Sequence, residues 1–287
     1  MVKLDVVTPH SVVDTTSVVA QRAANVGGIA LENFIIAIDS GRAETGNLLR
    51  PHLEAFFHLP VRHLHLTHMH TDHRNGIAAF KDVTLIASQQ AFANLPKSVK
   101  LTGYNLEAFE EKLVINDGDF SVEFHHVGGH TVGSSVAYFP AEKVLFGGDL
   151  FMAFGPNFKL PILTFYQNTG RKTGNPDEYI TAFEKLKAMD IEIIVPGHGS
   201  VIFTPQEELD LLLTFFKSLR ALFIAAIDEK QALKTLELPH LDVIERDFRR
   251  IEELPTKLQT RAKRQLNSQL NLLKTSFYNY YKTKTAH

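Results

Sequence analysis

The pattern of hydrophobic positions changes near residue 204. Before that point, short apolar runs alternate with glycine, proline, asparagine and aspartate, as in β-strands joined by turns. After it, apolar residues recur three or four positions apart, as on one face of a helix. We therefore predict an α/β domain over residues 1–204 and a helical extension over residues 205–287 that packs on it.

Several apolar runs of the first part should be strands. They are residues 26–31, 34–38, 62–67, 83–87, 113–115, 120–127, 136–139, 144–146 and 191–195. The first two should pair, and residues 48–57 should form a helix leading into the strand at 62–67. Asn175-Pro176-Asp177-Glu178 is typical of a helix start, with a cap, a proline at the first position and a glutamate three residues after the cap.

The second part contains helical patterns separated by prolines. Thr204-Pro205-Gln206-Glu207 repeats the helix-start pattern, and apolar residues at helical spacing follow over residues 212–223, 244–251 and 266–281. Pro239 and Pro255 separate these segments. We expect the helices to pack on the first domain. The sequence leaves open whether they also form a lid or the contact of a homodimer.

Composition restricts the partners and the donor atoms. With 44% hydrophobic and 22% charged residues, the chain can bury a substantial core. A net charge of −2 gives no reason to expect a nucleic-acid or membrane partner. The chain has no cysteine, so nitrogen and oxygen donors must hold any metal. No signal-like segment or long apolar run is evident, which favours a cytoplasmic protein.

The stretch His68-Met69-His70-Thr71-Asp72-His73 offers the strongest candidate chemistry. It places three imidazoles and a carboxylate directly after an apolar run. Imidazole is the commonest side-chain ligand for transition metals. In an extended segment, alternation would put His68, His70 and Asp72 on one face and leave His73 to serve a neighbouring metal. The stretch therefore suggests two ions.

Three later segments place one ligand-type side chain beside glycine after an apolar run. They are Gly128-Gly129-His130-Thr131, Gly147-Gly148-Asp149 and Pro196-Gly197-His198-Gly199. Glycine lets the backbone turn sharply and approach a bound ion. Each segment alone fits a turn or surface residue, but together with residues 68–73 they favour a metal site. We expect solvent-facing or hydrogen-bonded roles for the other histidines, which are His10, His52, His58, His63, His65, His125, His126, His240 and His287.

Taken together, these motifs and their order resemble the metallo-β-lactamase superfamily over roughly residues 1–204. The resemblance implies an αββα sandwich with the site at one edge. It also implies two divalent metal ions, most often zinc, with iron or mixed iron and zinc in some members. The implied ligands are His68, His70 and His130 for the first metal, Asp72, His73 and His198 for the second, and Asp149 as the bridge.

The same resemblance implies a dinuclear hydrolase in which a metal-bridging hydroxide attacks an ester-type substrate. Asp72 would orient the hydroxide and pass a proton to the leaving group. Absence of cysteine and presence of Asp149 disfavour the β-lactamases, and the short interval to His198 disfavours the nucleases. His70 stands where flavodiiron-like members carry glutamate. The remaining layout resembles glyoxalase II-like enzymes, lactonases, phosphodiesterases and thioesterases with a helical tail.

An aromatic stretch over residues 151–166 follows Asp149. Phe151, Phe154, Phe158 and Tyr166 would suit a wall for an acyl or alkyl group, or would cover the core. Two other functions stay open on the sequence. One is a ligand-binding regulatory module with vestigial esterase activity, and the other is a mononuclear iron persulfide dioxygenase.

Overall fold

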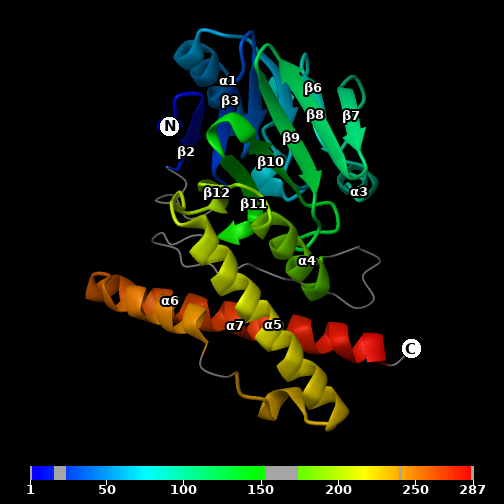
Figure 1. Cartoon of the computed structure of the whole chain (residues 1–287), viewed down its shortest axis with the longest axis vertical. Coiled ribbons are helices and arrows are strands. Elements are labelled where there is room, and N and C mark those ends of the chain that lie inside the picture. Colours follow the sequence, from blue (N-terminus) through cyan, green and yellow to red (C-terminus); the bar gives the residue numbers. More distant parts are fainter. Residues whose placement is uncertain (1, 16–23, 153–173, 239–240, 286–287) are drawn as a thin grey trace.

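Two β-sheets lie face to face, with helices on both outer faces (Figure 1). The computed structural model describes residues 2–15, 24–152, 174–238 and 241–285. This αββα arrangement is the one that the resemblance implies. The described helices include none long and apolar enough to cross a membrane.

The first sheet carries the opening histidine cluster beyond the end of β5, one of its inner strands. In spatial order its strands are β1 (Asp5–Thr8), β2 (Ser11–Asp14), β3 (Val26–Ala30), β4 (Ile35–Ile38), β5 (Val61–His65), β6 (Thr84–Ser88) and β7 (Asn105–Phe109). Pairing is antiparallel from β1 to β4 and parallel from β4 to β7. Helix α1 (Ala43–Phe57) and the 3₁₀ helix η2 (Ile77–Phe80) cover the outer face, where Leu53 and Phe80 are fully buried.

The second sheet carries the later candidate ligands. Its spatial order is β12 (Ile193–His198), β11 (Val144–Met152), β10 (Ser135–Phe139), β9 (Phe120–His126) and β8 (Lys112–Asp117). Only β11 and β12 pair in parallel among these described strands. Helix α4 (Pro176–Lys187) packs on the outer face of this sheet.

Strand alternation explains how one strand serves two cores. On β10, Ala137 and Phe139 face the first sheet, whereas Val136 and Tyr138 face the covering helices. All four side chains are buried, so the sequence of β10 is a continuous apolar run and does not alternate between apolar and polar residues.

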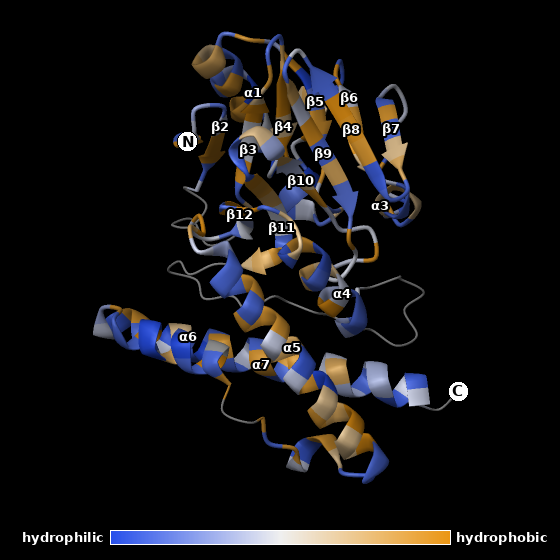
Figure 2. Cartoon of the chain, viewed as in Figure 1, coloured by the Kyte–Doolittle hydropathy of each residue, from blue (hydrophilic) through white to orange (hydrophobic). Residues whose placement is uncertain are grey.

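The C-terminal helices share the apolar core outside the second sheet. They are α5 (Pro205–Asp228), the 3₁₀ helix η4 (Leu233–Thr235), α6 (Asp242–Glu252) and α7 (Thr256–Thr285). Helix α7 crosses α5 beyond the sandwich (Figure 1), and Figure 2 shows how their polar residues alternate with apolar ones. Phe216 of α5 and Phe277 of α7 are both fully buried in this core. The division at residue 204 and the lid or homodimer role remain predictions.

Some elements differ from those that the sequence predicts. Helix α1 begins at Ala43 rather than at residue 48. The sequence pattern did not reveal its first turn, because that turn is mostly polar and lacks the apolar spacing of a helix. Strand β11 continues through Gly147-Gly148-Asp149 to Met152, so the strand end predicted at residue 146 is wrong. The continued strand is held by parallel pairing with β12, which sequence patterns do not reveal.

Candidate metal centre

Residues 68–73 leave the end of β5 and enter the short helix α2 (Thr71–Arg74). His70 precedes this helix with an extended backbone, at φ −69° and ψ 152°. The predicted strand-like alternation is therefore wrong beyond His70, because the chain becomes helical at Thr71. The helical turn groups Asp72 and His73 with His198, while His68 and His70 group with His130.

Three histidine nitrogens converge in the first group. His70 Nδ1 lies 3.0 Å from His68 Nε2 and 3.0 Å from His130 Nε2. Two nitrogens bound to one tetrahedral zinc at about 2.05 Å would lie about 3.3 Å apart. The spacing of the three nitrogens therefore suits a single cation.

The second group combines a carboxylate with two imidazoles. His198 Nε2, at the end of β12, lies 3.4 Å from Asp72 Oδ2. His73 is fully buried, and the side chain of Asp72 is 28% exposed. The donor atoms of this group also lie close enough together to bind one cation. Its Asp72 carboxylate is more exposed to solvent than the Asp149 carboxylate.

The Asp149 carboxylate lies between the two groups. Its Oδ2 atom is 3.8 Å from His68 Nε2 and 3.4 Å from His130 Nε2. Its Oδ1 atom is 3.0 Å from His73 Nε2 and 3.4 Å from His198 Nε2. Each oxygen therefore faces one group, which is the arrangement expected of a bridging ligand.

Two atoms between the groups lack the partner that a buried polar atom requires. Among the described residues, His73 Nε2 and Asp149 Oδ1 are buried and make no hydrogen bond, although they lie 3.0 Å apart. Burial without a partner costs free energy. A cation bound by both atoms would remove that cost, so the donor set fits a metal.

The charges of the site follow from burial and from the carboxylates. Burial lowers the pKa of His68 well below 6.5 and that of His70 to about 4, so both keep a lone pair at neutral pH. Burial alone would raise the pKa of Asp149, but His198 and His73 hold it well below its usual range. Asp149 is therefore a buried anion.

Asp39 is a functional residue that the sequence reasoning missed. Its Oδ2 atom accepts hydrogen bonds from His73 Nδ1 and Thr67 Oγ1, both at 2.8 Å, and its Oδ1 atom accepts one from the Thr67 amide at 2.8 Å. Thr67 Oγ1 also lies 3.1 Å from His68 Nδ1. Because Asp39 takes the hydroxyl proton, this oxygen accepts from His68. Both rings thus present Nε2 to the centre.

A weak signal for Asp39 exists in the sequence. Asp39-Ser40-Gly41 follows the strand at residues 35–38, which pairs with the strand that precedes the histidine cluster. Asp39 has a φ of 55°, and aspartate is one of the few residues enriched in that region. Nothing in the sequence alone tells this acid from an ordinary turn residue.

The four aromatic candidates for a substrate wall have different outcomes. Phe151 is 1% exposed and packs against Phe183 of α4, with ring centroids 5.7 Å apart. Phe151 therefore covers the core, which was the alternative role. Phe154, Phe158 and Tyr166 lie outside the described residues.

Comparison with known proteins agrees with this geometry. The family model of the metallo-beta-lactamase superfamily matches residues 22–198. A hydroxyacylglutathione hydrolase of Ruegeria pomeroyi is 30% identical over 144 residues, which are 46% of this chain and 46% of the relative. A metallo-beta-lactamase type 2 of Bacillus sp. (strain 170) is 28% identical over 154 residues, or 52% of this chain and 56% of the relative. The match spans about half the length of these relatives.

Solved structures show the same fold. A metallo-beta-lactamase from Pontibacter korlensis has a TM-score of 0.60 at 18% identity, over 76% of this chain and 99% of that one. The DIM-1 metallo-beta-lactamase has a TM-score of 0.60 at 17% identity, over 75% and 97%. The family match covers more than half of the chain and all seven candidate ligands. The chain belongs to the metallo-β-lactamase superfamily.

Proposed function

We propose that this protein is a dinuclear metal-dependent hydrolase that acts on an ester-type substrate. The observation that carries the proposal is the orientation of Asp149, which turns one oxygen toward each group of ligand atoms. His68, His70 and His130 would hold one cation, and Asp72, His73 and His198 the other. When bound, two such cations lower the pKa of a water molecule they share and polarise the substrate carbonyl or phosphoryl group.

Asp72 is the residue to which we assign the proton transfer. Its side chain is 28% exposed, against 5% for Asp149, so water and a leaving group can reach it. Burial raises the pKa of Asp72, but the hydrogen bond from His198 and the neighbouring His73 outweigh burial and hold the pKa below its usual range. Asp72 is therefore ionised at neutral pH and able to accept a proton.

We infer zinc as the first candidate metal and an ester-type group as the substrate. Nitrogen-rich sites with carboxylates suit zinc, while iron and mixed iron and zinc sites use the same donors. A lactone, a thioester or a phosphoester is the class we infer, and the hydroxyacylglutathione hydrolase among the relatives favours testing the thioester first. A β-lactam belongs in the same test because another relative is a metallo-beta-lactamase.

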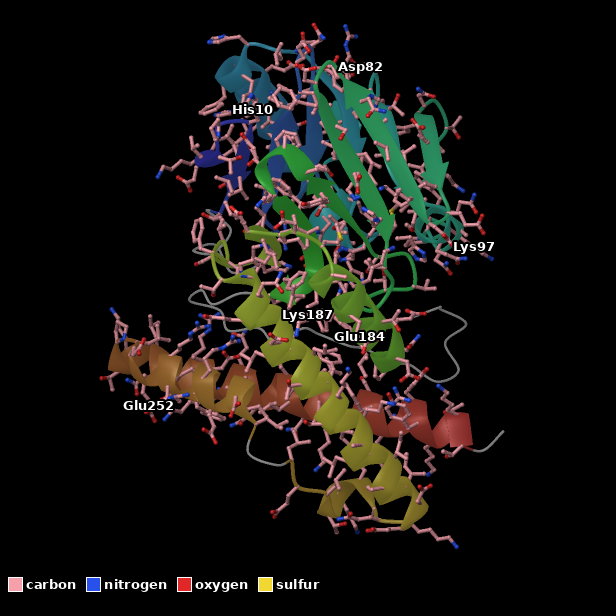
Figure 3. All side chains as sticks on the ribbon, viewed as in Figure 1. His10, Asp82, Lys97, Glu184, Lys187 and Glu252 are labelled. Atoms are coloured by element: carbon pink, nitrogen blue, oxygen red, sulfur yellow. The ribbon has the colours of Figure 1, made fainter. Side chains whose placement is uncertain are left out.

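An activity screen with a ligand variant tests the proposal. Zinc-loaded protein should hydrolyse one of the three ester classes much faster than β-lactams, and Asp149→Ala should lower kcat/KM more than about 100-fold. Asp82→Asn is the control, because Asp82 is 69% exposed in an ion pair with Arg50 and lies at the far end of the sandwich from α4 (Figure 3).

Three outcomes would contradict the proposal. Full activity of Asp149→Ala would remove the bridging role. Tight ligand binding with negligible turnover across the panel would indicate a regulatory module. Oxygen consumption with persulfide substrates and one iron per chain would indicate a dioxygenase.

A further inference from the structure

The backbone turn before His130 is held by helix α4. Gly128 and Gly129 have φ values of 67° and 86°, so the chain turns sharply just before this candidate ligand. The Gly129 amide donates a hydrogen bond to Glu178 Oε2 at 3.1 Å. Glu178 is the third residue of α4, and its own amide donates to the Asn175 side chain at 2.9 Å.

Glu178 does not complete the usual helix cap. In a capping box, the carboxylate at this position returns to the amide of the cap residue. Here the carboxylate instead crosses to a turn 49 residues away in the sequence. The contact is also tight, because a Cβ atom added to Gly128 would lie 2.8 Å from Glu178 Oε2. The turn before His130 therefore packs directly against Glu178, and the hydrogen bond from Gly129 ties it to α4.

The next residue of α4 contacts the bridging candidate. Tyr179 is fully buried, and its hydroxyl donates to the Asp149 backbone carbonyl at 3.5 Å. Its ring lies against Phe216 of α5, with centroids 4.6 Å apart. The first turn of α4 thus contacts the backbone of Asp149, which is a candidate ligand, and the backbone of Gly129, the residue before His130.

The opposite side of the first turn of α4 is held by hydrogen bonds from the C-terminal end of α7. The Asp177 carboxylate accepts hydrogen bonds from Tyr281 Oη at 2.8 Å, Tyr280 Oη at 3.0 Å and Lys284 Nζ at 2.7 Å. Burial raises the pKa of Asp177, yet these three donors lower it below its usual range, so the carboxylate stays charged. Residues more than 100 positions apart are joined at this point.

We propose that the first turn of α4 couples the docking of α7 to the geometry of the metal centre, with Glu178 as the positioning residue for His130. The inference rests on the proposed metal centre. Asp177 faces the C-terminal helix, Glu178 faces the His130 turn, and the helical backbone joins them rigidly. The C-terminal extension then supports the site as well as covering the sheet.

Metal affinity of Glu178 variants tests the positioning role. Glu178→Ala should weaken binding of Co²⁺ or Zn²⁺ at the histidine-rich group about 10-fold and change the visible Co²⁺ spectrum. Glu178→Gln keeps an oxygen acceptor at the same reach, so it should restore most of the affinity. The control is Glu184→Gln, on the same helix, where Glu184 pairs with Lys217 at 2.7 Å and both side chains are 51% exposed (Figure 3).

A second set of variants tests the coupling to α7. Tyr281→Phe combined with Lys284→Ala should weaken the same cation about 3-fold. Adding these changes to Glu178→Ala should cause no further loss of affinity, because Glu178→Ala already removes the contact between α4 and the turn before His130. Unchanged affinity in every variant, or fully additive losses, would overturn the coupling while leaving the metal centre intact. A wild-type protein that binds no cation would instead overturn the proposed function.

Discussion

At the scale of single residues, the direction of each histidine lone pair decides whether the site can hold a metal. His68 and His73 are each fixed through Nδ1, one by Thr67 and the other by Asp39. The opposite ring nitrogen of each residue then faces Asp149. One buried carboxylate, Asp39, organises both contacts, because it also holds Thr67.

Asp39→Asn should weaken metal binding without disturbing the backbone. Asparagine tolerates the positive φ of 55° at this position, but it lacks the charge and brings an amide that cannot accept. We expect both cations to bind about 10- to 100-fold more weakly, measured by competition with a chelator. Unchanged affinities, with a correctly folded variant, would show that Asp39 does not orient the ligands.

His65 should make the protein sensitive to acid. Burial lowers its pKa to about 3, and among the described residues its Nδ1 atom has no hydrogen-bond partner. In the unfolded chain the pKa is about 6.5. The folded pKa is the lower one, so the stability contribution is complete above pH 6.5 and is lost as the pH falls toward 3.

Urea unfolding at pH 7.5 and 5.0 measures this effect. Wild-type protein should lose about 2 kcal/mol more than His65→Leu between these pH values, because only the wild type must keep this imidazole neutral. The other histidines and any bound metal are common to both proteins, so the difference isolates His65. Equal losses in the two proteins would contradict the prediction.

At the scale of elements, the sequence predicts best where the local pattern decides the structure. The helix start at Asn175 is confirmed, with the Asn175 side chain accepting the Glu178 amide. The strands at residues 26–31 and 34–38 do pair as β3 and β4. These features depend only on residues that are close together in the sequence, so the sequence is enough to predict them.

Features set by distant contacts could not be predicted. The edge strands β1 and β7 lack a long apolar run, and only their neighbours in the sheet define them. The contact between Glu178 and Gly129 has a normal local alternative, since the carboxylate could complete its own cap. All seven candidate ligand residues were predicted from the sequence, and the structure brings them together. Their division into two groups came from the resemblance and not from alternation.

Gly197 is the residue at which the packing of β12 against β11 affects the metal centre most directly. A Cβ atom there would lie 2.1 Å from Asp149 Oδ1, because β11 and β12 run side by side at this point. Gly197→Ala should therefore displace the carboxylate and reduce the bound metal from two ions to one or none, as counted by elemental analysis.

Gly28→Ala is the matched control for Gly197→Ala. Gly28 lies on β3, where a Cβ atom would meet the Leu53 side chain at 2.8 Å. This variant should lose stability and keep its metal. Full metal content in Gly197→Ala would show that Asp149 is not held as described.

At the scale of the whole molecule, the C-terminal helices and the second sheet share one apolar core. Leu145 of β11, Phe183 of α4, Phe216 of α5 and Phe277 of α7 are all fully buried in it. Figure 2 shows that α7 carries polar residues along its length between the apolar ones. We therefore expect the chain to unfold as one cooperative unit.

Phe277→Ala tests that expectation. Phe277 packs against Phe216 and Phe223 at ring distances of 5.5 and 5.6 Å, so its removal leaves a cavity between α5 and α7. The free energy of unfolding should fall by about 3–5 kcal/mol, with fluorescence and circular dichroism still giving one shared transition. Two separate transitions would show that the helical part unfolds independently.

The number of metal ions per chain tests the central claim most directly. Elemental analysis of protein purified without added metal, then saturated with zinc and freed of excess, should give two ions per wild-type chain. Asp149→Ala should give one or none and should stay inactive when zinc is added. One ion per wild-type chain at saturation, or full activity after all metal is removed, would contradict a centre built on two cations.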